Sequence, residues 1–124
     1  MNVKKKTLLI KNREVNIEEI DLIKAVTGGI VIKYANGSLT FFRQDTRLSA
    51  IYRELISNGH RNFLPLQQIL INTDNLIGIS DGDSDDLIFT LIFEKNDEKI
   101  ELNSKEELVS LGLKIREKQS INQI

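Results

Sequence analysis

Cysteine is absent from this 124-residue chain, histidine and proline each occur once, and long apolar runs are missing. Without cysteine the chain has no disulfide scaffold, no thiol nucleophile and no thiolate metal site, which suits a reducing cytoplasm. The longest apolar stretches, such as Leu91-Ile92-Phe93, have the length of a strand and are too short to span a bilayer. We therefore expect a soluble, cytoplasmic protein that does not enter a membrane.

The residues that are present have the composition of one folded domain. Apolar residues make up 40% and charged residues 28% of the chain, and its length fits a single domain over residues 1–124. The formal net charge is −1, but the charges are unevenly distributed. Residues 1–62 contain eleven Lys/Arg and six Asp/Glu, a balance of +5, whereas residues 63–124 contain six and twelve, a balance of −6. The first half can therefore present a basic surface to a polyanion.

Most segments have the apolar content and the turn signals of β-strands. Thr27-Gly28-Gly29 marks one turn, and Asn36-Gly37 marks a hairpin, because both residues of a tight hairpin turn must accept a positive φ. The predicted strands are Val3–Ile10, Ile20–Val26, Ile30–Tyr34, Ser38–Arg43, Ile69–Ile71, Leu76–Ile79, Leu87–Glu94 and Lys99–Leu102. The last two are expected to pair across Asn96-Asp97.

Two segments change to the period of a helix. Over residues 46–57, Asp45 is a candidate N-cap and Asn58-Gly59 is a left-handed stop signal. Over residues 105–117, Ser104-Lys105-Glu106-Glu107 fits a capping box. The apolar positions of these helices are Leu48, Ile51, Tyr52 and Leu55, and Leu108, Leu111 and Ile115. The sequence therefore predicts a mostly β (α+β) domain with one central and one C-terminal helix.

No arrangement of residues indicates catalysis or metal binding. His60 has no serine or cysteine nucleophile pattern beside it and no second histidine to share a metal. Asp81–Asp86 imitates the start of a calcium loop, but position 6 is Asp86 instead of glycine and position 12 is Ile92 instead of glutamate. Gly28-Gly29 lacks the spacing of a phosphate loop and leads into a strand. We expect no enzyme, no cofactor, no metal and no small-molecule substrate.

The order of short motifs along the chain is also informative. The acidic pair and apolar run of Glu18–Ile23 precede a turn, a strand and the Asn36-Gly37 hairpin, and the helix that begins near residue 46 follows. The next motifs are Phe63, Ile69-Leu70-Ile71-Asn72 and Leu76-Ile77-Gly78-Ile79. Over about residues 5–115, this series resembles the LytTR-type DNA-binding domain of bacterial response regulators and stand-alone regulators.

This resemblance implies an elongated arrangement of adjacent antiparallel β-sheets, whose loops enter successive major grooves of duplex DNA. It also implies a role in transcription regulation without a cofactor. The residues that it implicates in DNA contact are Thr27, Gly29, Gln67, Gln68, Ser104 and Lys105. Gln67 can read adenine through N6 and N7, and Lys105 can contact guanine or a phosphate. The loop at Thr27-Gly28-Gly29 offers no long side chain.

Departures from the family pattern keep a second function open. Leu64-Pro65-Leu66-Gln67-Gln68 stands where the family has a segment with arginine and histidine, and the pI is near 5.9. These features favour a LytTR-like module that has lost its DNA contacts and binds another protein, or a second copy, through an exposed strand edge. The basic first half and the retained Gln67 and Lys105 favour duplex DNA. A basic stripe that joins the three loops would favour DNA, and a neutral or acidic surface would favour the protein partner.

Overall fold

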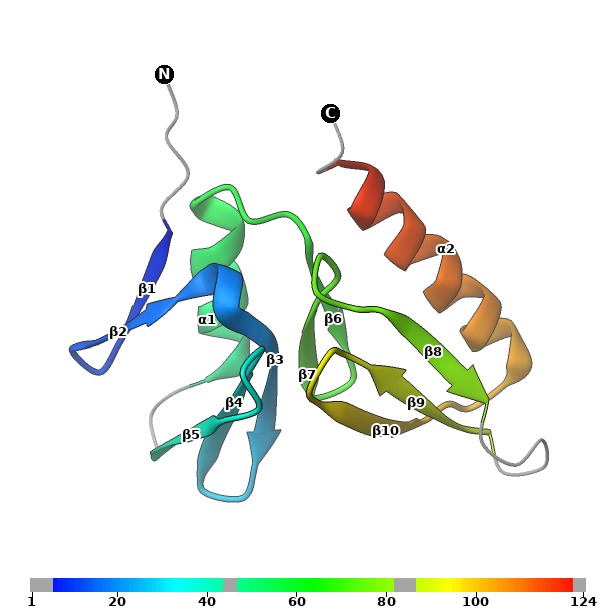
Figure 1. Ribbon diagram of the computed structural model, residues 1–124, viewed down its shortest axis with the longest axis horizontal. Helices are drawn as coiled ribbons and strands as arrows, with labels where there is room; N and C mark the ends of the chain where they lie inside the picture. Colours follow the sequence, from blue (N-terminus) through cyan, green and yellow to red (C-terminus); the bar gives the residue numbers. More distant parts are fainter. Residues whose placement is uncertain (1–5, 44–46, 82–86, 122–124) are drawn as a thin grey trace.

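The computed structural model describes residues 6–43, 47–81 and 87–121 (Figure 1). Its fold is mostly β, with antiparallel sheets and two α-helices, which confirms the predicted fold class. The strands are β1 (Thr7–Ile10), β2 (Arg13–Asn16), β3 (Ile20–Val26), β4 (Gly29–Tyr34), β5 (Leu39–Arg43), β6 (Phe63–Leu66), β7 (Ile69–Asn72), β8 (Gly78–Asp81), β9 (Ile88–Ile92) and β10 (Asp97–Glu101). The helices are α1 (Leu48–Ser57), α2 (Lys105–Ile121) and a short 3₁₀ turn, η1 (Ile17–Glu19).

The described strands form three antiparallel sheets. The largest has five strands in the order β5-β4-β3-β7-β6, the next has three in the order β10-β9-β8, and β1 pairs with β2 in a hairpin. Figure 1 shows the hairpin on the left, the five-stranded sheet in the middle and the three-stranded sheet on the right. The sheets are therefore adjacent along the long axis of the molecule.

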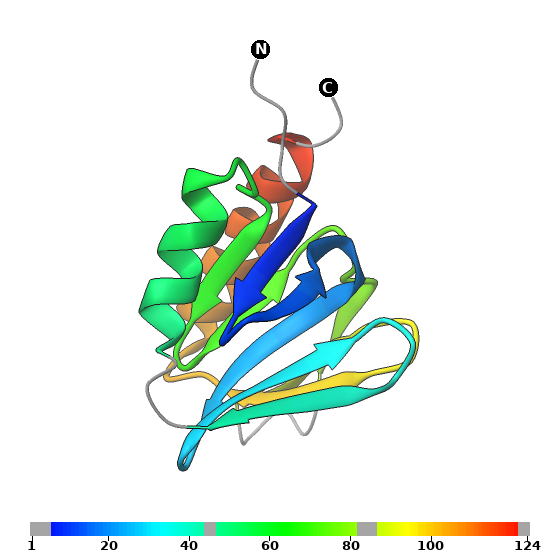
Figure 2. The same ribbon diagram turned by 90° about the vertical axis from the view of Figure 1, so that its left-hand side faces the viewer.

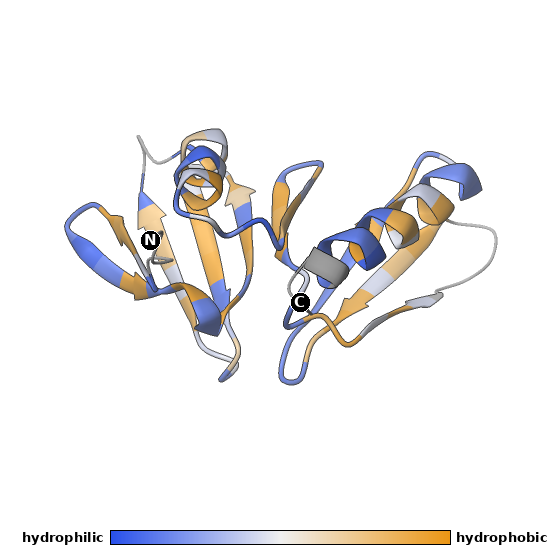
Figure 3. Cartoon of the chain, turned by 90° about the horizontal axis from the view of Figure 1, so that it is seen from above, coloured by the Kyte–Doolittle hydropathy of each residue, from blue (hydrophilic) through white to orange (hydrophobic). Residues whose placement is uncertain are grey.

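The five-stranded sheet is the middle layer, because apolar side chains are buried on both of its faces. On one face, α1 and the β1–β2 hairpin cover a first core that includes Ile23 and Leu55 (Figure 2). On the other face, α2 and the three-stranded sheet cover a second core that includes Leu22 and Leu91. In Figure 3 the apolar residues follow the strands of the two larger sheets, while both helices mix polar and apolar residues.

Strand β3 contributes to both cores. A β-bulge shifts its register with β4 between Ile20 and Leu22. Ile20 and Ile23 consequently lie in the first core, and Leu22 lies in the second. A strand that is buried on both faces reads as a continuous apolar run instead of an alternating one, and Ile20–Val26 is predicted on that basis with its observed bounds.

The predicted Asn36-Gly37 hairpin is confirmed, but its turn differs from the expected one. Gly37 has a φ of +89°, whereas Asn36 does not adopt a positive φ. The Oδ1 atom of Asn36 instead accepts a hydrogen bond from the Ser38 N–H at 2.8 Å. The Tyr34 N–H closes the loop on the Ser38 carbonyl at 2.9 Å. One left-handed residue is enough here, because the loop is longer than a two-residue turn.

Both helices form where the sequence predicts them. Asn58 is the C-cap of α1 and Gly59 has a φ of +88°, so the predicted stop is confirmed. The candidate N-cap Asp45 lies outside the described residues, and Arg47, which directly precedes α1, makes no side-chain cap hydrogen bond. Helix α2 begins at the predicted residue and continues beyond residue 117 to Ile121.

Two strands are missing from the prediction, β2 and β6. Strand β2 buries only Val15, and it returns from β1 through Lys11 and Asn12, which both adopt a positive φ. Strand β6 contains Pro65, which lacks the N–H of a ladder and is tolerated because β6 is an edge strand. Val3 and most of the acidic loop (residues 82–86) lie outside the described residues.

Candidate nucleic-acid interface

The three loops that the resemblance implicates lie at one end of the five-stranded sheet. The β3–β4 turn (Thr27-Gly28) and the β6–β7 turn (Gln67-Gln68) extend from the same end, because β3 and β7 are antiparallel neighbours. The Ala25 N–H donates to the Gln68 carbonyl at 2.8 Å, and Gln67 Nε2 donates to the Glu101 carbonyl at the end of β10 at 2.6 Å. Both turns point to the lower side of Figure 1, where α2 also begins. We call the residues Thr27–Gly29, Gln67–Gln68 and Ser104–Lys105 the loop end.

Gln67 is exposed, but its side chain already has a partner within the protein. Its backbone adopts a φ of +54° and so completes the tight turn between β6 and β7. A groove of about 250 Å³ lies beside it, between β6 and α2, with Pro65, Asn103 and Lys114 in its lining. Reading adenine with two hydrogen bonds uses both the oxygen and the nitrogen of the amide. Nε2 carries two N–H donors, so the Glu101 carbonyl occupies one of them and leaves the second donor and the amide oxygen for a base.

Thr27 and Gly28 form the exposed tip of the β3–β4 hairpin. Gly28 has a φ of +88°, which suits a glycine at this turn. Gly29 is required for a different reason, because a Cβ atom there would lie 1.9 Å from the Phe42 carbonyl oxygen on β5. Gly29 therefore lets the β4 and β5 backbones approach closely, and the side chain that this turn offers to a ligand is the Thr27 hydroxyl.

The start of α2 has a variant of the predicted capping box, in which the acid bonds to the residue before the N-cap Ser104. Ser104 Oγ accepts the Glu107 N–H at 3.3 Å, and the Glu107 carboxylate reaches back to the Asn103 N–H at 2.7 Å. That backbone hydrogen bond, and a second one from the Asn103 side chain, lower the pKa of Glu107 below its usual value. Ser104 is therefore a structural cap, whereas Lys105 is exposed on the first turn and presents the positive charge of this loop.

The charge at the loop end is mixed. Arg43 lies opposite Gly29 across the β4–β5 pair, which adds a cation near the β3–β4 turn. Exposed Glu101 and Glu106 lie next to the segment that carries Lys105. The described residues therefore form neither a continuous basic stripe across the three loops nor a wholly acidic surface.

Two further lysines are held by a carboxylate between the two larger sheets. Glu98 of β10 is buried and accepts hydrogen bonds from Lys24 Nζ at 2.5 Å and from Lys33 Nζ at 2.9 Å. Burial alone would raise the pKa of Glu98, but the hydrogen bonds and positive charges of the two lysines outweigh it, so the net pKa is lowered. These lysines therefore fasten β3 and β4 to β10.

Asp21, at the bulge of β3, is the second buried acid between these sheets. It is 1% exposed and accepts hydrogen bonds from Asn96 Nδ2 at 2.7 Å and from Asn75 Nδ2 at 3.2 Å. Burial raises the pKa of Asp21, and the two amide donors offset only part of that effect. The pKa values of the two acids are therefore shifted in opposite directions, because Glu98 has cationic partners and Asp21 has neutral ones.

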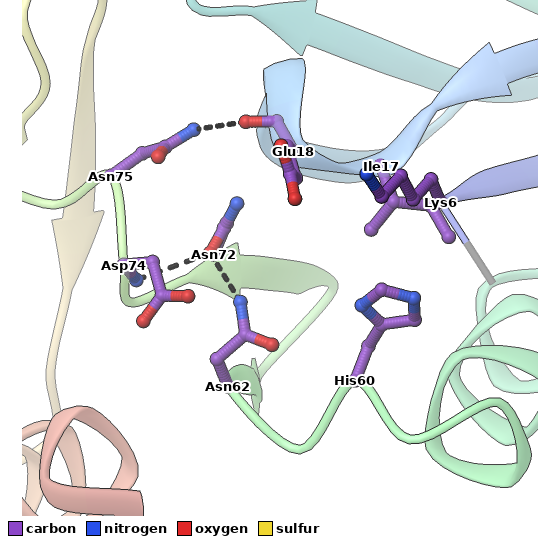
Figure 4. Close-up of a pocket in the computed structure, with 8 residues that line it drawn as sticks. All are labelled: Lys6, Ile17, Glu18, His60, Asn62, Asn72, Asp74 and Asn75. Carbon is purple, nitrogen blue, oxygen red and sulfur yellow. Dashed lines mark hydrogen bonds between the residues drawn. The ribbon is translucent and has the colours of Figure 1, made fainter. Parts of the chain in front are cut away.

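A polar pocket of about 450 Å³ lies at the other end of the five-stranded sheet (Figure 4). It contains the single histidine, His60, which follows α1 and is only 4% exposed. Asn62 is also buried and donates from Nδ2 to Asn72 Oδ1 at 2.6 Å, while its own Oδ1 has no partner among the described residues. Figure 4 shows this oxygen turned away from Asn72 toward the side of His60.

Sequence patterns do not reveal this pocket, because its asparagines come from two segments, the one after α1 and the one at the end of β7, that meet only in the folded sheet. The Thr73 N–H and hydroxyl donate to the Asn62 carbonyl at 3.1 and 2.6 Å, and Gln119 Nε2 of α2 donates to the Thr73 carbonyl at 3.0 Å. These bonds tie the segment after α1 to the β7–β8 connection and to the end of α2. The network is thus part of the framework that holds the two cores together.

In comparisons with known proteins, no family model, no curated protein and no solved structure matches this chain. Within the described ranges, no group of three or more histidine or acidic side chains is arranged to hold a metal ion. No helix in that part of the chain is long and apolar enough to cross a membrane.

Proposed function

We propose that this protein binds duplex DNA through the loop end and regulates transcription in the cytoplasm of a bacterial cell. The observation that supports this proposal is the position of the three loops. Thr27–Gly29, Gln67–Gln68 and Ser104–Lys105 are distant in sequence, yet they extend from one end of the layered sheets. Loops held on a rigid sheet are suited to reach into the grooves of a duplex.

The residues of the loop end have different roles in this proposal. Gln67 reads adenine in the major groove through its amide oxygen and the Nε2 hydrogen that is not bonded to the Glu101 carbonyl. Lys105, exposed on the first turn of α2, contacts a phosphate, and the Thr27 hydroxyl adds a neutral hydrogen bond at the neighbouring turn. Gly29 and Ser104 hold the backbone of the loops in place.

The mixed charge of the loop end predicts weak binding that depends on salt. About three to five phosphates would be neutralised, so the log–log slope of affinity against salt should be about −3 to −5. Strongly basic DNA-binding proteins have steeper slopes. Fluorescence anisotropy titrations between about 50 and 200 mM salt measure this slope directly.

A selection from random duplex DNA tests the proposal and identifies the preferred site. We expect enrichment of a sequence that contains adenine at a position protected by the protein. The selection is repeated with the Gln67→Ala variant, which should lose the preference at that position. If no duplex is bound even at about 50 mM salt, the proposal is wrong.

A second candidate function is protein binding through β5. This strand is an edge of the five-stranded sheet, and its side chains Leu39 and Phe41 are 61% and 47% exposed. An exposed edge with apolar side chains is suited to pair with a strand of another protein. Peptides selected by display should then lose binding to the Phe41→Ser variant and keep binding to Leu9→Ser, a change at an exposed leucine on β1.

A further inference from the structure

Helix α2 carries apolar side chains on two opposite faces. Leu111 and Ile115 are buried in the second core. Val109 and Leu113 are 64% and 61% exposed, and at 100° per residue they lie on the side of the helix away from that core. A helix that covers a core needs only one apolar stripe. The outward pair is therefore not explained by the folding of one chain.

Two acids border this outward face. Glu106 and Glu117 project in nearly the same direction as Leu113, because they lie seven residues before it and four residues after it. Neither carboxylate forms an ion pair with another described residue. The outward face of α2, defined by Glu106, Val109, Leu113 and Glu117, is thus apolar in the centre and acidic at both ends.

A groove on the opposite side of the molecule has the complementary character. It lies between β1 and α1, has a volume of about 490 Å³, and is lined mainly by apolar residues with two cations, Lys11 and Arg47, and one acid, Glu54. Leu9 in its wall is exposed. Neither cation is paired with another described residue. We call this surface the β1–α1 groove.

We propose that the outward face of α2 docks into the β1–α1 groove of a second copy of this chain. The centre of the contact buries Val109 and Leu113 against Leu9, while Glu106 and Glu117 approach Lys11 and Arg47. Complementary charges fix the register of a contact, and repulsion between charges of the same sign opposes contacts between two copies of one surface.

The contact joins two different surfaces, so its geometry is head-to-tail. Figure 1 shows α1 and β1 on the left of the molecule and α2 on the right. A docked pair would therefore keep one free groove and one free helix face, and association continues into short chains unless a ring closes. None of the contact residues belongs to the loop end, so this proposal does not depend on the proposed DNA-binding function.

Sedimentation velocity of the full chain between about 20 µM and 1 mM tests the proposal, because a contact of this size is expected to be weak. We expect the weight-average sedimentation coefficient to rise with concentration and to fall again at high salt. Leu9→Ser and Leu113→Ser should each weaken association by about five- to tenfold, through lost apolar burial without a change of charge. Leu39→Ser, an equally exposed leucine on β5, is the matched control and should have no effect.

A charge-swap experiment tests the pairing of the two surfaces. The double variant Lys11→Glu/Arg47→Glu and the double variant Glu106→Lys/Glu117→Lys should each remain monomeric and should associate when mixed. Adding Leu9→Ser to both should weaken the association of the mixture by about five- to tenfold as well, which separates docking from simple attraction between opposite net charges. Circular dichroism establishes that each variant is folded.

Three results would overturn the proposal. They are a wild-type chain that stays monomeric at 1 mM, a Leu39→Ser variant that is weakened as much as Leu9→Ser, and charge-swapped variants that fail to associate when mixed. The second result would assign self-association to the β5 edge instead. All of these measurements are made without DNA, so a failure of DNA binding leaves them unaffected.

Discussion

At the scale of single residues, Gly29 belongs to the loop end, but its role is to let the β4 and β5 backbones pack closely. An added Cβ atom would lie 1.9 Å from the Phe42 carbonyl oxygen, a backbone atom that cannot rotate away. Gly29→Ala should therefore destabilise the protein by about 1–3 kcal/mol. Gly78, where an added Cβ meets nothing within 4 Å, is the matched control, and Gly78→Ala should change stability by about 0.5 kcal/mol or less. Urea denaturation measures both, and equal effects would contradict the packing role of Gly29.

Gln67 is the residue whose substitution distinguishes base reading from general attraction. If it reads adenine, Gln67→Ala should weaken binding to the selected site by about 1–3 kcal/mol and binding to random duplex much less. Gln68→Ala, in the same turn, is the control and should have a smaller effect on the selected site. Anisotropy titrations on both duplexes measure these differences. An equal loss on both duplexes would argue against base reading by Gln67.

Lys105 should act differently, because an exposed lysine that holds a phosphate carries no sequence information. Lys105→Ala is expected to weaken binding to selected and random duplexes alike, and to reduce the log–log salt slope by about one unit. Lys99→Ala removes the same charge from an exposed position on β10 outside the loop end. An unchanged slope in Lys105→Ala, or an equal reduction in Lys99→Ala, would contradict the assigned phosphate contact.

At the scale of elements, Glu98 makes the junction between β10 and the β3–β4 pair sensitive to pH. Its pKa is lowered in the folded state, so its stabilisation is fully present above its unfolded pKa and is lost as the pH falls through the folded pKa. The difference in unfolding free energy between wild type and Glu98→Gln should therefore be largest near neutral pH and should shrink in acid. Asp21 is present in both proteins, so its opposite contribution cancels in the difference.

Urea denaturation at a series of pH values measures this difference. Glu101→Gln is the control, because Glu101 lies on the same strand but is exposed and forms no ion pair with the other described residues. Its effect should be small at every pH. A Glu98→Gln effect that stays constant down to strongly acidic pH would show that the two lysines do not hold Glu98 in the ionised form.

The elements differ in how far local sequence predicts them. The capping box at Ser104 and the stop at Asn58-Gly59 act within a few residues, so both helices could be predicted. Strand β6 could not, because Pro65 is acceptable only at a sheet edge, and edge position is decided by the order of strands. The pocket that contains His60 could not be predicted for a similar reason, since Asn62 and Asn72 meet only when β6 and β7 pair.

At the scale of the whole molecule, the two cores share the five-stranded sheet and should unfold together. Leu55 of the first core and Leu91 of the second are fully buried, so replacing either with alanine should cost about 2–5 kcal/mol. Tyr34 and Tyr52 pack against the first core, so tyrosine fluorescence reports on it, while far-UV circular dichroism reports on the whole chain. Each variant should show one transition, at the same midpoint by both probes.

Leu39→Ala, at an exposed position, is the control and should change stability by about 0.5 kcal/mol or less. A Leu91→Ala variant in which the circular dichroism transition moves and the tyrosine transition does not would show that the cores unfold separately. That result would also mean that the shared sheet does not couple them.

By itself, the sequence determined the mostly β fold class, the two helices and most of the strands, because hydrophobic period, caps and turn residues act over short distances along the chain. The order of its motifs, through the resemblance to a known family, also indicated the three loops of the candidate interface. Only the tertiary structure decided that these loops share one end of the sheet, that Gln67 is bound to the Glu101 carbonyl, and that Lys24 and Lys33 are held by Glu98. These contacts join residues far apart in the chain, so they depend on strand order and register, which no local pattern encodes.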